Sequence, residues 1–131
     1  MTRKTPLARK TPLKRKVKKP SAKTLTAKLD ALARAHCIAN ACGKCLRCGG
    51  RGRLEWCHLK SRGYKAIRWN PANSAALCCQ CHRYFTMNPD LWREFMERLR
   101  PGIWGILNKI LQRKEKPDYA GWLAFYKEQG A

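Results

Sequence analysis

The sequence has few acidic residues and no long hydrophobic run. Only 8 Asp and Glu stand against 29 Lys and Arg in 131 residues, so the net charge is +21. No apolar stretch approaches the roughly 20 residues of a membrane-spanning helix, and none follows the basic N-terminus as a secretion signal requires. We therefore expect a cytoplasmic protein. Its charge calls for a polyanionic partner, and nucleic acid fits better than a membrane.

The N-terminal segment contains no acid before Asp30. Eleven Lys and Arg lie within residues 1–28, where the pentapeptide Arg-Lys-Thr-Pro-Leu occurs twice. A segment of this composition cannot bury enough apolar surface to fold. We predict a disordered basic arm over residues 1–23 that binds phosphates without sequence preference, the alternative being a solubility tail. Residues 24–131 would then form one domain, which is basic in its own right.

The hydrophobic pattern predicts an α+β fold. Leucines at helical spacing predict a first helix over residues 24–38. The turn-rich, cysteine-bearing segment 43–82 suits short strands, with 54–56 and 66–69 as the candidates. The remainder is helical and is divided into three helices by start and stop signals. These signals are Asn88-Pro89-Asp90, Pro101-Gly102 and Pro117-Asp118.

Eight cysteines without a secretion signal favour metal binding over disulfides. Two Cys-x-x-Cys pairs separated by 29 residues can place four thiolates tetrahedrally around one zinc. These pairs are Cys45/Cys48 and Cys78/Cys81. Cys42 offers an alternative first pair with Cys45, and free thiols without metal are a further alternative. The glycine after Cys48 favours Cys45/Cys48, because amides approach the sulfur in such a turn and a side chain would crowd it.

The other cysteines have no role in this zinc site. Cys79 lies inside the second pair and should point away from the metal. Cys37 and Cys42 are expected to be small buried hydrophobic residues, which is the usual state of a free cysteine.

Three histidines occur in the chain, and two of them are tied to the zinc segment. His58 lies between the two cysteine pairs, Asn73 follows it, and His82 comes directly after the second pair. A lone histidine is usually structural, so the informative feature is the order His, Asn, His with the last residue attached to a Cys-x-x-Cys pair.

With this pattern the sequence resembles the HNH (His-Me finger) endonucleases in their zinc-stapled branch, and it is most similar to the phage NinG/Rap-type recombination endonucleases. The resemblance covers roughly residues 24–111. It implies a ββα-metal finger in which His58 ends the first strand, Asn73 ends the second and His82 lies on or at the start of the next helix. The matching stretches are 45–49, 58–63, 66–73, 77–82 and 84–92.

The resemblance implies hydrolysis of DNA in a bacterial host cell, with branched or recombination intermediates as the expected substrates. His58 would be the general base, since a neutral imidazole accepts a proton from water near pH 7. His82 would hold a divalent cation (Mg²⁺, Mn²⁺ or a softer ion) that stabilises the leaving oxygen. Asn73 would hydrogen-bond backbone near His58 and orient the imidazole. The candidates for DNA phosphate contacts are Lys60, Arg62 and Arg68, with Arg62 favoured.

The catalytic metal site departs from the family pattern. Cys57 stands where most HNH enzymes carry an Asp or His ligand, and a thiolate suits Mg²⁺ poorly. It either binds a softer ion or only packs. Thr86 stands where some members have a further ligand. The second interpretation is a non-enzymatic zinc-containing DNA-binding or recombination-accessory protein, which includes an inactive HNH-like module, and the third is an RNA- or ribosome-associated protein. Only the nuclease needs the His, Asn, His series.

Overall fold

A computed structural model describes residues 18–130 of the chain. Most of the predicted basic arm, residues 1–17, therefore lies outside the described residues. The end of that arm differs from the prediction, because the first helix, α1, spans Ala22–Asn40 and takes in two residues assigned to the arm. Ser21 caps it, since its hydroxyl accepts a hydrogen bond from the Thr24 amide at 3.2 Å.

The described residues form an α+β fold of five α-helices and one two-stranded antiparallel sheet. The predicted signals begin the three C-terminal helices. Pro89 occupies the first turn of α3, Gly102 precedes α4 with φ +79°, and the Asp118 carboxylate accepts from the Gly121 amide at the start of α5. After α1 the elements are β1 (Leu54–His58), the 3-10 turn η1 (Pro71–Asn73), β2 (Ser74–Cys78), α2 (Cys79–Met87), α3 (Pro89–Leu99), α4 (Ile103–Gln112) and α5 (Tyr119–Glu128).

The sheet pairs β1 with β2, in register from Leu54 opposite Cys78 to His58 opposite Ser74. The prediction of a strand at 66–69 is wrong, and so is the expectation that Asn73 ends the second strand. Residues 66–69 lie in turns, although buried Ile67 and Trp69 alternate as in a strand. The pairing partner of β1 is the next segment, and Asn73 lies directly before it.

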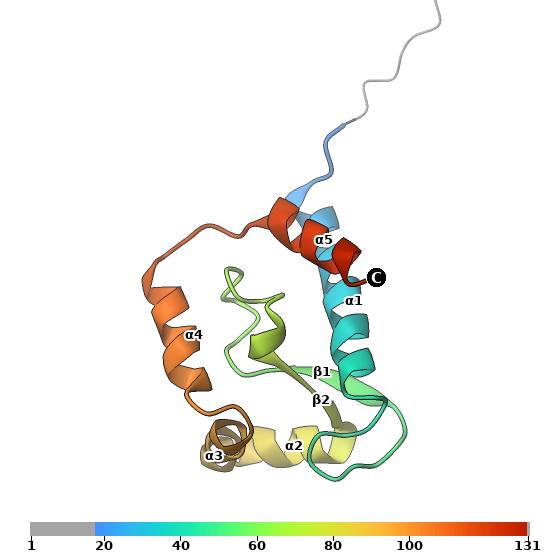
Figure 1. The fold of residues 1–131 in the computed structure, drawn as a ribbon, viewed down its shortest axis with the longest axis vertical. Helices are drawn as coiled ribbons and strands as arrows, with labels where there is room; N and C mark the ends of the chain where they lie inside the picture. The colour runs from blue at the N-terminus through green and yellow to red at the C-terminus, as the bar shows by residue number, and fades with distance from the viewer. Residues whose placement is uncertain (1–17, 131) are drawn as a thin grey trace, which may run out of the picture.

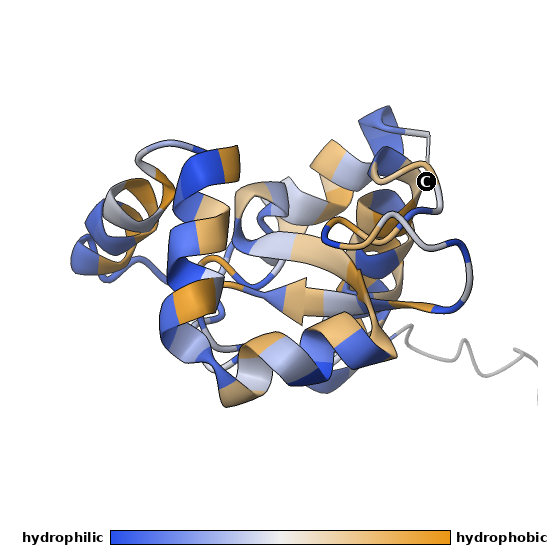
Figure 2. Cartoon of the chain, turned by 90° about the horizontal axis from the view of Figure 1, so that it is seen from below, coloured by the Kyte–Doolittle hydropathy of each residue, from blue (hydrophilic) through white to orange (hydrophobic). Residues whose placement is uncertain are grey.

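Helices cover the sheet in layers (Figure 1), and hydrophobic residues concentrate on the strands between them (Figure 2). Trp56 packs with α1 and α5, whereas Cys57 packs with Phe85 of α2. Neighbouring side chains of a strand point to opposite faces, so β1 contacts two layers. On the face of the sheet that Trp56 covers, α5 lies against α1. Tyr126 of α5 donates a hydrogen bond to the Trp69 carbonyl.

The segment from the end of β1 to η1 is held by two apolar clusters. Leu59 and Ile67 pack with Met96 and Leu107 of α3 and α4. Trp69 packs in the other cluster with α1 and the aromatic residues of α5. The turns carrying the candidate site are therefore anchored on both sides. Among the described residues no helix has the length and apolarity to cross a membrane.

Candidate functional site

Four cysteines from two separate segments converge on one point, and we call them the four-cysteine group: Cys45, Cys48, Cys78 and Cys81. Their sulfurs all lie within 4.8 Å of one another, and those of Cys48 and Cys78 are 3.8 Å apart. Four sulfurs that each lie about 2.3 Å from a tetrahedral zinc are about 3.8 Å from one another. The group could therefore hold a metal ion such as structural zinc, and the predicted set of four is the one brought together.

Two glycines shape the turn of the first pair. Gly49 has φ +71°, a conformation that strains other residues. The Gly50 amide donates to Cys48 Sγ at 3.4 Å, and a Cβ on Gly50 would lie 3.2 Å from that sulfur. The crowding argument made for the residue after Cys48 thus applies to Gly50 instead. The Leu46 amide, bonded to the Ala76 carbonyl at 3.0 Å, joins this turn to β2.

Two of the four thiols have shifted pKa values, and the shifts are in opposite directions. Burial acts to raise the pKa of Cys45, but hydrogen bonds from the amides of neighbouring residues outweigh it and lower the value to about 6. The pKa of Cys81 rises to about 12 because of burial and the adjacent thiols, although the Arg47 guanidinium donates to its sulfur at 3.7 Å. A cation at the centre of the group would stabilise the thiolate form of all four residues, because it offsets the repulsion among their negative charges.

The remaining cysteines lie outside this group. Cys79 is exposed, as expected. Cys37 is half-buried, but the prediction that Cys42 is buried is wrong. Cys42 lies in the exposed turn that ends α1, with φ +55°. The alternative first pair of Cys42 with Cys45 is not the one assembled.

His58 is the last residue of β1, and its ring is fixed by one hydrogen bond and one aromatic contact. Its Nε2 donates to the Arg68 carbonyl at 3.1 Å, so the lone pair of the neutral ring is on Nδ1. The ring meets Trp56 edge-on, with 4.2 Å between centroids. Burial lowers the pKa of His58 to about 4, and the nearby charge of Arg62 adds to this effect. The imidazole is therefore neutral at pH 7 and able to accept a proton.

Asn73 is fully buried, and its side chain ties together the backbone that follows His58. Oδ1 accepts from the Lys60 amide at 2.7 Å, while Nδ2 donates to the carbonyls of Lys60 and Ile67, each at 3.2 Å. These bonds fix the two ends of the connection between β1 and η1. The role in backbone positioning expected for Asn73 matches these contacts.

Arg68 is engaged within the fold. Its guanidinium binds both carboxylate oxygens of Asp30 in α1, at 2.9 and 2.6 Å, and Trp69 Nε1 donates to the same carboxylate at 2.9 Å. Asp30 thereby positions the carbonyl that receives the His58 hydrogen bond. Of the three predicted phosphate contacts, Arg62 is exposed and Lys60 is half-buried, whereas the charge of Arg68 is already paired.

His82 lies in the first turns of α2 and faces a residue that the sequence reasoning missed. Its Nδ1 lies 3.3 Å from Glu55 Oε1, and both side chains are 42% exposed. Glu55 precedes Cys57 by two residues, so the two share a face of β1. The alternation of a strand could have placed Glu55 on the same face as Cys57. Its contact with His82 depends on the packing of α2 against β1, which the sequence does not show.

The side chain of Cys57 packs in an apolar cluster and is not exposed to a metal ion in solution. It is 3% exposed among Leu54, Leu77 and Phe85, and its thiol donates to the Glu55 carbonyl at 3.6 Å. Burial raises the pKa of this thiol to about 12, with a further contribution from the Glu55 carboxylate. Of the two expectations for Cys57, its surroundings favour packing.

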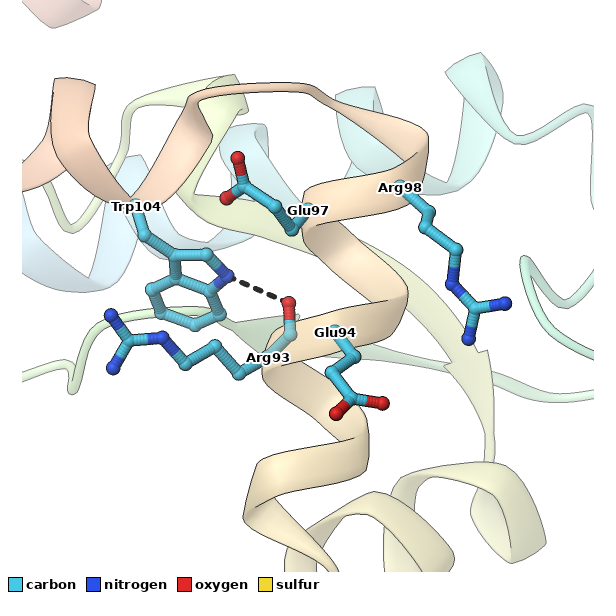
Figure 3. A pocket seen from close by; sticks show the side chains of 5 residues that line it. All are labelled: Arg93, Glu94, Glu97, Arg98 and Trp104. Atoms are coloured by element: carbon cyan, nitrogen blue, oxygen red, sulfur yellow. Dashed lines mark hydrogen bonds between the residues drawn. The ribbon is translucent and has the colours of Figure 1, made fainter.

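One cavity of about 220 Å³ is lined by both His58 and His82, and we call it the histidine pocket. Its wall also includes Thr86. A larger groove of about 630 Å³ lies between α3 and α4 (Figure 3). There the Trp104 ring donates to the Arg93 carbonyl at 2.9 Å, beside charged side chains of both signs. This groove contains no histidine or cysteine, so the histidine pocket is the better candidate for chemistry.

Comparisons with known proteins return no relative. No protein-family model matches the chain, and no curated protein or solved structure matches it.

Proposed function

We propose that this protein is a metal-dependent endonuclease of the HNH type that hydrolyses phosphodiester bonds of DNA. The observation that carries the proposal is the shared cavity of His58, from β1, and His82, from α2. Both residues belong to a ββα unit, and the four-cysteine group joins the end of β2 and the first turn of α2 to the turn that precedes β1. The net charge of +21 attracts the protein to the phosphates of DNA. The proposed substrates are branched or recombination intermediates in phage DNA metabolism.

His58 acts as the general base in this proposal. Its Nε2 hydrogen is committed to the Arg68 carbonyl, so Nδ1 is the atom that takes the proton from the attacking water. A pKa of about 4 in the free protein is low for a base. A phosphate bound beside the ring would raise it, because an anion stabilises the protonated imidazole.

Glu55 and His82 are the residues proposed to hold a divalent cation. Two neighbouring ligands of an octahedral cation, each at about 2.1 Å from it, lie about 3 Å apart. The 3.3 Å separation of Glu55 Oε1 and His82 Nδ1 fits this requirement. A carboxylate with an imidazole suits Mg²⁺ or Mn²⁺ better than Cys57 would. When bound, such an ion would polarise the phosphate and stabilise the leaving oxygen.

Cleavage assays with defined metals test this proposal. The purified protein is incubated with supercoiled plasmid and with a four-way DNA junction, without added metal and with Mg²⁺, Mn²⁺ or Ni²⁺. Metal-dependent nicking is expected. Glu55→Gln should raise the metal concentration needed for half-maximal cleavage, whereas Glu94→Gln, on the exposed face of α3, should leave it unchanged.

Absence of cleavage with every metal and substrate would reject the nuclease. The second candidate would then be a zinc-containing DNA-binding or recombination-accessory protein. The net charge and the four-cysteine group support this candidate as well as they support the nuclease. An unchanged metal requirement in Glu55→Gln, with an active parent protein, would reject only the metal ligand.

A further inference from the structure

Next to the Glu55–His82 pair lies a second cavity, of about 230 Å³, which we call the arginine pocket. Its lining residues are Arg34, Arg53, Glu55, Trp56, Arg62 and His82. The three arginines come from separate parts of the fold. Arg34 lies on α1, Arg53 directly precedes β1, and Arg62 follows β1 in the turns that Asn73 holds in place.

None of these three guanidinium groups has an ion-pair or hydrogen-bond partner among residues 18–130, although the Arg62 guanidinium lies over the Trp56 ring, 5.7 Å from its centroid. The ion pairs there join Arg68 with Asp30 and His82 with Glu55, and no hydrogen bond is made by the side chains of the three arginines. All three arginines are exposed. Three like charges gathered at one cavity repel one another, and Glu55, the one acid in the wall, is shared with His82.

An anion with several acceptor oxygens would satisfy this arrangement. A guanidinium presents a planar fork of N–H donors that matches two oxygens of a phosphate. The wall also includes Trp56, whose indole N–H is the buried side-chain donor left without a partner in the described part of the chain. The three arginines are exposed, so the pocket is accessible from solvent. One phosphate of a nucleic-acid strand can therefore occupy it while the rest of the strand lies outside.

We propose that the arginine pocket binds a single backbone phosphate of a nucleic-acid strand, with Arg34, Arg53 and Arg62 as its shared ligands. Identification of the strand as DNA rests on the proposed function. His58 does not line this pocket, whereas Glu55 and His82 do, so the bound phosphate is a neighbour of the one that is hydrolysed. The pocket thus sets the position of the strand relative to the metal ligands.

Equilibrium binding tests the pocket separately from cleavage. Full-length protein is titrated into a fluorescent DNA duplex over a range of salt concentrations, without added divalent metal. The duplex has about 20 base pairs, which is longer than a protein that makes 6–10 phosphate contacts requires. The test variant is Arg34→Gln/Arg53→Gln/Arg62→Gln. The control is Arg93→Gln/Arg98→Gln/Arg113→Gln, which removes three exposed cations elsewhere. Melting curves and zinc content verify that both variants are folded.

The shared pocket predicts a roughly tenfold or greater loss of affinity in the test variant relative to the control. Loss of one phosphate contact should also reduce the slope of log K against log salt by about 0.9. Equal affinities and slopes in the two variants would overturn the inference. A slope reduced by about three would also overturn it, because each arginine would then contact its own phosphate.

The outcomes separate this inference from the proposed function. If the parent protein cleaves no DNA but the test variant still loses affinity and slope, the pocket stands and the nuclease fails. If the parent protein cleaves DNA and the two triple variants bind equally, the nuclease stands and the pocket fails.

Discussion

Asn73 and Lys60 are joined by a pair of hydrogen bonds that close a ring between the side-chain amide of Asn73 and the backbone N–H and C=O of Lys60. The Lys60 amide donates to Asn73 Oδ1 at 2.7 Å, and Asn73 Nδ2 donates to the Lys60 carbonyl at 3.2 Å. The Leu59 amide, one residue after His58, donates to the Asn73 carbonyl at 2.9 Å. The exit of the chain from β1 is therefore fixed by one buried residue.

Replacing Asn73 should damage both stability and activity. Asn73→Ala removes three hydrogen bonds and leaves the partly buried amide and carbonyl of Lys60 without their partner, which we expect to cost about 2–4 kcal/mol of unfolding free energy. Denaturant unfolding measures this loss. Asn108→Ala, at an exposed position of α4, is the matched control and should change stability by less than about 0.5 kcal/mol. Similar losses in both variants would contradict the positioning role.

The four-cysteine group should make folding depend on metal. Elemental analysis should find about one tightly held zinc per chain, and Cys45→Ser should abolish cooperative melting because three thiolates hold the ion more weakly. Removal of metal by a chelator should have the same effect on the parent protein. Cys79→Ser, which changes an exposed thiol of the same segment, should retain zinc and melt normally. A metal-free protein with an unchanged melting curve would rule out the zinc site.

Asp30 should stabilise the fold equally at pH 7 and pH 5. Burial acts to raise the pKa of this carboxyl, but the hydrogen bonds from Arg68 and Trp69 outweigh it, so its folded-state pKa lies below the ordinary value. A lowered pKa contributes stability that is present above the unfolded value of about 3.9 and is lost only as pH falls below it.

We therefore expect Asp30→Asn to reduce the free energy of unfolding by about 1–2 kcal/mol, with the same difference at both pH values. Parallel denaturant titrations measure it. A difference that shrinks between pH 7 and pH 5 would mean that the carboxyl is protonated there, contrary to its pairing with Arg68.

Cys57 should be dispensable for cleavage. Because its buried thiol only packs, Cys57→Ala should lower stability by about 1 kcal/mol and leave the preference among metals unchanged. Cys57→Asp places a carboxylate in an apolar cluster and should destabilise the protein by several kcal/mol. Thermal melting and metal-dependent cleavage measure the two effects. A changed metal preference in folded Cys57→Ala would return Cys57 to the set of ligands.

The sequence predicted best those features that depend on local spacing. The two Cys-x-x-Cys pairs identify the four cysteines that the fold brings together, because each turn places its own two sulfurs. The signals Asn88-Pro89 and Pro101-Gly102 likewise mark real helix boundaries, since proline and glycine act on the backbone where they stand.

Features that depend on contacts between distant segments could not be predicted from local spacing. Ile67 and Trp69 have the alternating pattern of a strand, but each packs in a different apolar cluster and their backbone turns toward the Asn73 side chain. Glu55 carries no motif, and its importance arises from the contact with His82 on α2. Arg68 looks like a free cation until Asp30, 38 residues away, is placed against it.

Substitution of His58 tests the nuclease most directly. With supercoiled plasmid and the optimal metal ion, His58→Ala should lower the cleavage rate by on the order of 10²-fold or more, because the general base acts in the transition state. Its zinc content and DNA affinity should remain close to those of the parent protein, and it should still melt cooperatively, at a temperature lowered by the loss of the ring's hydrogen bond and its contact with Trp56. His36→Gln, which changes the histidine on α1, should retain cleavage. A His58→Ala protein that cleaves at the parent rate would contradict the assignment of His58 as the base.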